Sequence, residues 1–247
     1  MTSLIELKEK YNIDTDKQSE STALGNFHNY LGVYEEIFKD VKDEDISILE
    51  IGVWKGESLK LWSKYFTKGK IYGIDIFERD SKEKVEKNIS QFERINLYKV
   101  NSYKEDKNSI ENRNQFFKSI GDLKFDIIID DGEHSFESQI KTFAKFKHLL
   151  SDSGIYIIED IRDWCSEHGW LKCPHNPPKL EMNDRGEITH IRLINTKEKP
   201  WNDYSKCSDT HLQLVKKAIP ELKIIDLNPP EGGNVPDNII GYYQKQI

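Results

Sequence analysis

Two apolar runs that end abruptly in acidic residues constrain the fold of this 247-residue chain more than any other feature. The first, FDIIIDDGEH, covers residues 125–134, and the second, SGIYIIED, covers residues 153–160. Short isoleucine-rich runs of this kind are typical of fully buried strands in a parallel sheet. If the two strands are parallel neighbours, their acidic ends and His134 lie at one edge of the sheet. We therefore expect a functional site at that edge.

Strand and helix patterns alternate along most of the chain. Further strands are expected at 46–52, 70–76 and 95–100, and helices at 3–11, 26–38, 57–66, 78–93, 108–120, 135–150 and 209–218. This alternation predicts an α/β fold, with a parallel sheet covered by helices on both faces. The patterns at 222–227 and 238–244 add two strands that we expect to be antiparallel at the sheet edge, which gives a mostly parallel seven-stranded sheet.

The chain is interpreted as one embellished domain. We divide it into an N-terminal helical lid (1–45), a cofactor-binding core (46–160), a substrate flap or insertion (161–208) and a C-terminal helix with edge strands (209–247). All eight prolines lie beyond Arg162, which marks the change in composition at the flap. A small hairpin is expected within the flap, near residues 188–194.

Charge and cysteine content narrow the class of partner and the compartment. The net charge is −7 with both signs interspersed, which argues against a broad surface for nucleic acid or anionic membranes. Three cysteines without a CxxC motif indicate a reducing, cytoplasmic setting. We expect neither a secretion signal nor a membrane span. We expect a small-molecule partner, and we leave open whether the chain forms a homo-oligomer.

A nucleotide-type site is indicated where the first two strands end. Gly52 and Gly56 follow the first strand, where glycine permits a sharp turn and a close approach of a ligand to the backbone. The GxxxG spacing lacks the middle glycine of a dinucleotide fingerprint, which argues against NAD. Asp75 ends the second strand, where its carboxylate could accept both hydroxyls of a ribose. A helix cap is the alternative for Asp75.

Asn101 and Ser102 follow the third strand and could meet an adenine edge, although turn chemistry explains them equally well.

The acidic ends of the two opening strands suggest a metal site. Asp130 and Asp131 follow one strand, and Glu159 and Asp160 end the other. Carboxylates gathered in this way repel one another unless a cation neutralises them, and oxygen ligands favour Mg²⁺ over Zn²⁺. Helix capping and surface ion pairs are the alternative. His134, three residues beyond Asp131, is a candidate general base, or else a histidine satisfied by the backbone at a helix start.

The flap offers two weaker signals. Four residues there could suggest zinc, but their spacing fits none of the common ligand patterns: Cys165, His168, Cys173 and His175. Four aromatic residues could stack on a sugar or form a satellite core: Trp164, Trp170, Trp201 and Tyr204.

Taken together, the motifs resemble those of a known enzyme family. The segments ILEIGVWKGESLKLW, YGIDI, DIIIDDGEH and GIYIIED, with TDK upstream, are similar to the S-adenosylmethionine-dependent O-methyltransferases of the macrocin and mycinamicin type. These are class I methyltransferases, with a Rossmann-like fold, that act on sugar hydroxyls of natural products, several of them with Mg²⁺. The resemblance covers about residues 15–160.

The resemblance implies a role for each candidate residue. It places Glu50, Gly52 and Asp75 around S-adenosylmethionine, and we add four cofactor candidates from the strand ends: Gly56, Asn101, Ser102 and Asp130. A purely structural role is the alternative for Asp130. The resemblance further implies that Asp131 and Asp160 hold the metal, with Glu159 as a third ligand and Glu50 as a further candidate. It also implies that His134 is the general base, and that Asp131 and His134 serve the same reacting oxygen.

Two other functions remain in view. Hydroxylase-type relatives share the acidic motif, which raises a metal-dependent oxidoreductase; an iron site of that kind would need two histidines and a carboxylate. A non-catalytic nucleotide-binding module is the third possibility, and the combination of a base with a metal site disfavours it.

Overall fold

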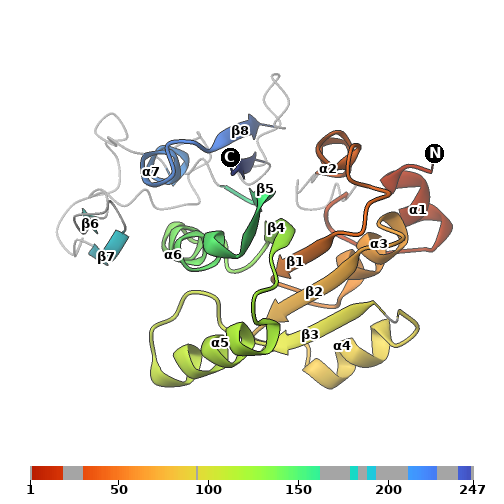
Figure 1. Cartoon of the computed structure of the whole chain (residues 1–247), viewed down its shortest axis with the longest axis horizontal. Helices are drawn as coiled ribbons and strands as arrows, with labels where there is room; N and C mark the ends of the chain where they lie inside the picture. Colours follow the sequence, from red (N-terminus) through yellow and green to blue (C-terminus); the bar gives the residue numbers. More distant parts are fainter. Residues whose placement is uncertain are drawn as a thin grey trace, which may run out of the picture.

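A seven-stranded sheet forms the centre of the computed structural model (Figure 1), which describes residues 2–18, 30–92, 94–161, 179–182, 188–192, 211–226 and 239–245. The strand order is β3-β2-β1-β4-β5-β9-β8. The strands are β1 (Ser47–Ile51), β2 (Lys70–Asp75), β3 (Ile95–Lys99), β4 (Phe125–Asp130), β5 (Leu150–Ile158), β8 (Lys223–Asp226) and β9 (Ile239–Gln244).

Strands β1 to β5 are parallel to one another, whereas β9 is antiparallel to both β5 and β8. The prediction of a mostly parallel sheet with an antiparallel edge is therefore confirmed. The antiparallel strand itself lies one position in from the edge, because β9 is inserted between β5 and β8.

Helices cover both faces of the sheet. They are α1 (Leu4–Lys10), α2 (Tyr30–Phe38), α3 (Glu57–Tyr65), α4 (Lys82–Ile89), α5 (Lys107–Ile120), α6 (Phe136–Phe146) and α7 (His211–Ala218). In Figure 1, α1, α2 and α3 lie on one side of the sheet and α5, α6 and α7 on the other. Alternate strand residues feed the two cores: Ile48 and Ile127 pack with α1 to α4, and Leu49 and Ile128 pack with α5 to α7.

The bounds of three elements differ from those expected. The helix expected at 78–93 is confined to α4, because the Ser81 hydroxyl accepts the Lys84 N–H and so caps the helix. Its Val85 and Ile89 side chains are buried. The helix expected at 135–150 ends at Phe146 and continues as one 3-10 turn, η1 (Lys147–Leu149). Strand β5 then begins at Leu150, whereas the fifth strand was expected at 154–159.

The hairpin expected in the flap corresponds to β6 (Lys179–Met182) paired antiparallel with β7 (Ile188–Arg192). The four possible zinc ligands and the four aromatic residues of the flap lie outside the described residues.

The sheet topology fixes where a ligand can bind. Strand β1 is flanked by β2 on one side and β4 on the other, so the chain switches direction of travel across the sheet at this point. In open α/β sheets, ligands bind outside the carboxyl ends of the strands at such a switch. The register between β4 and β5 aligns Asp130 with Ile158, which brings Asp131 and Glu159 to the same edge.

Candidate active site

A cavity of about 510 Å³ opens at the carboxyl ends of β1, β2 and β3. This volume lies within the range of small-molecule sites, which is roughly 300–1,000 Å³. Its lining carries more acids than bases. The acids are Asp14, Asp16, Glu57, Glu78, Asp80, Glu133, Asp75 and Asp131, and the bases are Lys55, Arg79 and Lys104, with His134 also at the wall. The cavity therefore favours a ligand with positive charge.

Asp75 anchors the loop after β1. Its Oδ2 accepts the backbone N–H groups of Val53 and Trp54, at 2.7 and 3.1 Å, and its Oδ1 accepts that of Phe77 at 2.6 Å. A carboxylate offers about four acceptor sites. Three are used here, so that Asp75 combines a loop-anchoring role with capacity for about one further hydrogen bond toward the cavity.

Gly52 lies where the chain that leaves β4 crosses over the end of β1. Its φ is +90°, and a Cβ atom at this position would be 1.9 Å from the carbonyl oxygen of Asp131. Only glycine fits that crossing. Gly56 has a different reason: it caps α3 with a φ of +82°, and a Cβ would meet Ile89 of α4 at 2.9 Å. Gly56 thus serves close helix packing and does not line the cavity.

Asn101 and Ser102 line the cavity, and both also stabilise local structure. The Asn101 side-chain oxygen accepts the N–H groups of Tyr103 and Lys104. The Ser102 hydroxyl is 2.9 Å from that of Thr142.

Asp130 and Glu50 are buried away from the cavity. Burial raises the pKa of Asp130 to about 8, and its Oδ2 accepts a hydrogen bond from the Tyr156 hydroxyl at 3.4 Å. Glu50 points toward α3, where Ser58 and Trp62 donate hydrogen bonds to its Oε2 at 2.8 and 3.2 Å. Neither carboxylate lines the cavity, so the prediction that they contact the cofactor gains no support from their positions.

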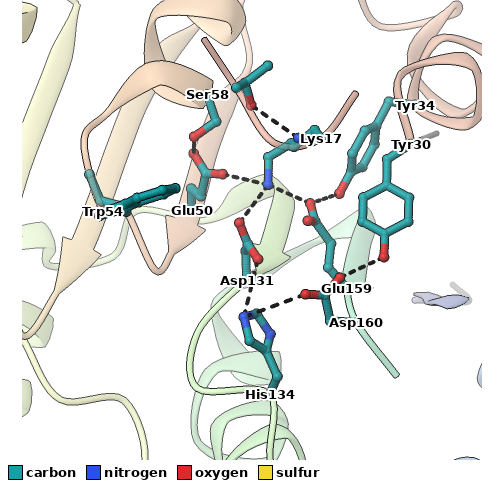
Figure 2. Close-up of polar contacts among 12 residues, drawn as sticks. Lys17, Tyr30, Tyr34, Glu50, Trp54, Ser58, Asp131, His134, Glu159 and Asp160 are labelled. Atoms are coloured by element: carbon teal, nitrogen blue, oxygen red, sulfur yellow. Dashed lines mark hydrogen bonds and ion pairs between the residues drawn. The ribbon is translucent and has the colours of Figure 1, made fainter. Parts of the chain in front are cut away.

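Asp131, His134 and Asp160, which we call the outer group, converge beside the cavity. Their potential ligand atoms all lie within 4.8 Å of one another. His134 Nε2 is 3.7 Å from Asp131 Oδ1 and 3.7 Å from Asp160 Oδ2 (Figure 2). Two carboxylates on adjacent strand ends are suitable oxygen ligands for Mg²⁺, and an imidazole beside them can accept a proton. The residues present therefore fit a divalent cation.

The backbone around the site is strained in a consistent way. Among the described residues, five that are not glycine have a positive φ, and four of them follow the carboxyl ends of the strands: Trp54, Phe77, His134 and Asp160, at 45°, 54°, 61° and 53°. Such conformations cost on the order of 1–3 kcal/mol each and cluster at functional sites. The strain marks the same edge that the acidic residues mark.

Gln139 of α6 supports the backbone of the second acidic pair. Its side-chain amide donates to the carbonyl oxygens of Glu159 and Asp160, at 2.9 and 3.4 Å. Its oxygen is 2.8 Å from Nε2 of His211, on α7. This buried bridge holds Asp160 in its unusual backbone conformation.

The second half of the acidic cluster contains a lysine. Lys17 Nζ lies 3.1 Å from Glu50 Oε1, 2.8 Å from Asp131 Oδ2 and 2.7 Å from Glu159 Oε1, and its side chain is fully buried (Figure 2). We call these four residues the inner cage. Tyr34 donates a hydrogen bond to Glu159 Oε1. Glu159, predicted as a metal ligand, is thus engaged by Lys17 and Tyr34 and is not part of the outer group.

The charges of the inner cage depend on one another. Burial alone would lower the pKa of Lys17, but Asp131, Glu159 and Glu50 outweigh it and raise that pKa well above its ordinary value. Burial raises the pKa of Glu50 to about 6, against the opposing effect of Lys17. Burial and the neighbouring Asp131 likewise raise the pKa of Glu159. Lys17 is therefore the charge that makes this burial of carboxylates tolerable.

Two tyrosines of α2 complete the surroundings of the acids. Tyr30 donates a hydrogen bond to Asp160 Oδ1 at 2.6 Å, as Tyr34 does to Glu159. Burial raises the pKa of both hydroxyls, so that they remain donors. From the sequence, these tyrosines were only part of the helix expected at 26–38. The only sequence signal for Lys17 was its place in the TDK segment.

The fold defines the class of protein. A solved structure described as the MycE methyltransferase of the mycinamycin biosynthetic pathway, in complex with Mg, SAH and mycinamycin VI, matches 99% of this chain and 55% of its own length, with a TM-score of 0.55 and 24% identity. A putative caffeoyl-CoA O-methyltransferase from Staphylococcus aureus matches 99% of this chain and 93% of its own length, with a TM-score of 0.54 and 15% identity. The fold is that of class I methyltransferases.

The sequence comparison agrees with the fold. Residues 49–161 match a family model described as a methyltransferase domain. This segment therefore matches a methyltransferase domain, and the curated relatives described next bear out the resemblance to the macrocin and mycinamicin type.

Curated relatives are longer than this chain. Demethylmacrocin O-methyltransferase of Streptomyces fradiae is 30% identical over 175 residues, which are 68% of this chain and 40% of that protein. Mycinamicin VI 2''-O-methyltransferase of Micromonospora griseorubida is 28% identical over 144 residues, which are 56% of this chain and 32% of that protein. The chain thus spans about a third to two fifths of the length of these relatives.

No helix in the described part of the chain has the length and apolar character needed to cross a membrane.

Proposed function

We propose that this chain transfers a methyl group from S-adenosylmethionine to a hydroxyl of a sugar or sugar-linked small molecule, with the help of Mg²⁺. The observation that carries the proposal is the outer group, two carboxylates and a histidine within 4.8 Å, beside a cavity at the switch point of a methyltransferase sheet. Support comes from relatives whose names specify sugar hydroxyls, such as L-olivosyl-oleandolide 3-O-methyltransferase of Streptomyces antibioticus.

The cavity supplies the features that the cofactor needs. S-adenosylmethionine carries a sulfonium and an ammonium group, which suit the acidic lining. Gly52 keeps the wall free of a side chain, and Asp75 has capacity for about one ribose hydroxyl in addition to its backbone partners. Asn101 and Ser102 lie where the third strand ends and would meet the base. A solved neighbour contains SAH, the product that methyl transfer leaves behind.

Asp131 and Asp160 would hold the Mg²⁺ ion. The ion, when bound, lowers the pKa of an acceptor hydroxyl and orients it. Asp131 Oδ1 and Asp160 Oδ2 are each 3.7 Å from His134 Nε2, so that an acceptor oxygen held by the two carboxylates would also be within reach of the imidazole. An oxygen-rich set favours Mg²⁺ over zinc.

The reaction needs one proton transfer and one displacement. His134 Nε2 takes the proton from the acceptor hydroxyl. The hydroxyl oxygen forms a bond to the methyl carbon while the carbon–sulfur bond breaks. The electron pair of the broken carbon–sulfur bond stays on sulfur. Because the displacement is in line, alignment of oxygen, carbon and sulfur is the main contribution of the protein.

The remaining parts of the chain are assigned to the acceptor. We propose that residues 161–208 select it and that residues 1–45 cover the site, with cytoplasmic location and possible self-association as further proposals. The alternative iron-type oxidoreductase is not favoured, because the outer group contains one histidine and such sites use two.

Cofactor titration combined with turnover tests the function. Calorimetry should detect S-adenosylmethionine binding. His134→Gln and Asp160→Asn should keep that affinity within about threefold while lowering kcat by about a hundredfold or more, as expected for loss of an acid–base group. Glu137→Gln, in the first turn of α6 and outside both the outer group and the cavity lining, is the matched control and should retain turnover. Absence of cofactor binding would refute the function, and full turnover in excess chelator would remove the metal from it.

A further inference from the structure

The inner cage has the form of a cation-binding site that is already filled. Its three carboxylate oxygens come from three adjacent strands: Glu50 lies on β1, Asp131 follows β4 and Glu159 follows β5. All three approach one nitrogen, Lys17 Nζ, at 2.7 to 3.1 Å. Figure 2 shows the ammonium between the three side chains. Carboxylates converging from separate elements are what hard divalent cations use as ligands.

The two oxygens of the Glu50 carboxylate have different surroundings. Its Oε1 is buried and has no hydrogen-bond partner, although Oε2 of the same carboxylate has two. The atom is aimed at the Lys17 ammonium, 3.1 Å away, which is longer than the other two contacts. A buried carboxylate oxygen whose close partner is a cation fits a position that a spherical ion could also ligate.

Asp131 connects the inner cage to the outer group. Its Oδ2 faces Lys17 at 2.8 Å, and its Oδ1 faces His134 at 3.7 Å. In two-metal enzymes, two ions about 3.5–4 Å apart are clamped in comparable fashion. Here one of the two positions flanking Asp131 is taken by a side chain of the protein.

We propose that the Lys17 ammonium is the resident cation of the inner cage and closes it to divalent ions, so that the cluster binds one metal ion, in the outer group. Lys17 is thereby a positioning residue: it holds Asp131 by one oxygen and leaves the other for the reaction. The part of this inference that concerns the outer ion rests on the proposed function. The inner cage itself is defined by the distances around Lys17 alone.

The experiment counts bound ions. Wild-type protein and Lys17→Ala, which empties the cage, are titrated with Mn²⁺ and the bound ion is measured by electron paramagnetic resonance and calorimetry. We expect one ion per chain in the wild type and two in Lys17→Ala. Lys17→Met fills the same space without a charge and should gain no second ion. Lys39→Ala removes an exposed lysine that pairs with Glu36, and it controls for non-specific binding at a more acidic surface.

Stability gives a second measurement. Because Lys17→Ala leaves three buried carboxylates without their cation, it should unfold at lower urea concentration than the wild type, and Mn²⁺ should restore most of the loss. If the variant does not fold in metal-free buffer, refolding with Mn²⁺ should rescue it. A folded Lys17→Ala that binds no additional ion, or a variant that fails to fold with and without Mn²⁺, would overturn the inference.

The outcome is separable from that of the proposed function. If the wild type neither binds S-adenosylmethionine nor shows turnover, while Lys17→Ala gains one ion over the wild type, the function fails and the inner cage stands. If the wild type is an active methyltransferase and folded Lys17→Ala gains no ion, the cage interpretation fails alone.

Discussion

Asp130 allows a quantitative test of the electrostatics at the sheet edge. Its side chain is 3% exposed at the end of β4, and burial raises its pKa from 3.8 to about 8. Between these values the folded protein keeps the proton and the unfolded chain does not. Unfolding therefore releases a proton, and the free energy of unfolding decreases as pH rises through this window. Each pH unit corresponds to about 1.4 kcal/mol.

Asp130→Asn should remove this dependence, because the amide has nearly the same shape and does not titrate in this range. From pH 5 to pH 7, the wild type should lose about 3 kcal/mol more stability than the variant. Above about pH 8 the difference should become constant. The asparagine oxygen can still accept the hydrogen bond from Tyr156.

The measurement is urea unfolding of both proteins at pH 5, 6, 7 and 8. Ser119→Ala, which removes a hydroxyl that donates to the Phe116 carbonyl on α5, is the control and should shift the profile without changing its slope. Parallel profiles for wild type and Asp130→Asn would show that Asp130 is ionised in the folded protein, and would refute the account of its burial.

Two further substitutions test the geometry. Gly52→Ala places a Cβ against the Asp131 carbonyl at a φ of +90° and should lower the free energy of unfolding by on the order of 3 kcal/mol. Gly32→Ala is the control in α2, where an added Cβ meets no atom within 4 Å, and it should stabilise the protein by about 0.5–1 kcal/mol. Equal effects of the two substitutions in thermal unfolding would contradict the crossing described for Gly52. Gln139→Leu leaves the Glu159 and Asp160 carbonyls without their amide donor, so it should lower the free energy of unfolding by about 1–3 kcal/mol and weaken Mn²⁺ binding. Lys141→Met is the control, because it removes only a partly exposed ion pair with Glu137; it should change stability by less than about 1 kcal/mol and leave Mn²⁺ affinity unchanged.

The sheet and the acidic residues at its edge could be predicted from the sequence, because both follow from local residue patterns. The isoleucine runs before Asp131 and Asp160 are strands because their composition suits a sheet buried on both faces. Parallel neighbours then have their carboxyl ends together, so the convergence of Asp131, His134 and Asp160 followed from topology.

Side-chain direction was less predictable. On β1, side chains alternate between the two faces of the sheet, so Glu50 lies on the face of Ile48 and opposite to that of Leu49. That face packs against α3 and does not line the cavity. The alternation alone would have placed Glu50 there, but its position at a strand end was given more weight. Gly56 was interpreted through ligand binding, although the close packing of Ile89 against it requires a contact between helices that no local pattern reveals.

The position of Lys17 among the acidic residues could not be predicted from local sequence patterns. Its partners Asp131 and Glu159 are 114 and 142 residues away along the chain. A lysine in a polar stretch is ordinarily solvated, and only the tertiary structure shows that this one replaces water with three carboxylates.

These long separations also bear on the order of folding. During synthesis, Lys17 emerges long before Glu159, so the inner cage can close only after all of β1, β4 and β5 have been made. Until then Glu50 must remain hydrated or protonated, because its counter-ion has no fixed position. Closing so long a loop is entropically costly, which places cage formation late, after the parallel strands have paired. A fragment limited to residues 46–161 would contain the complete sheet edge and yet lack the one positive charge that lets its acids stay buried.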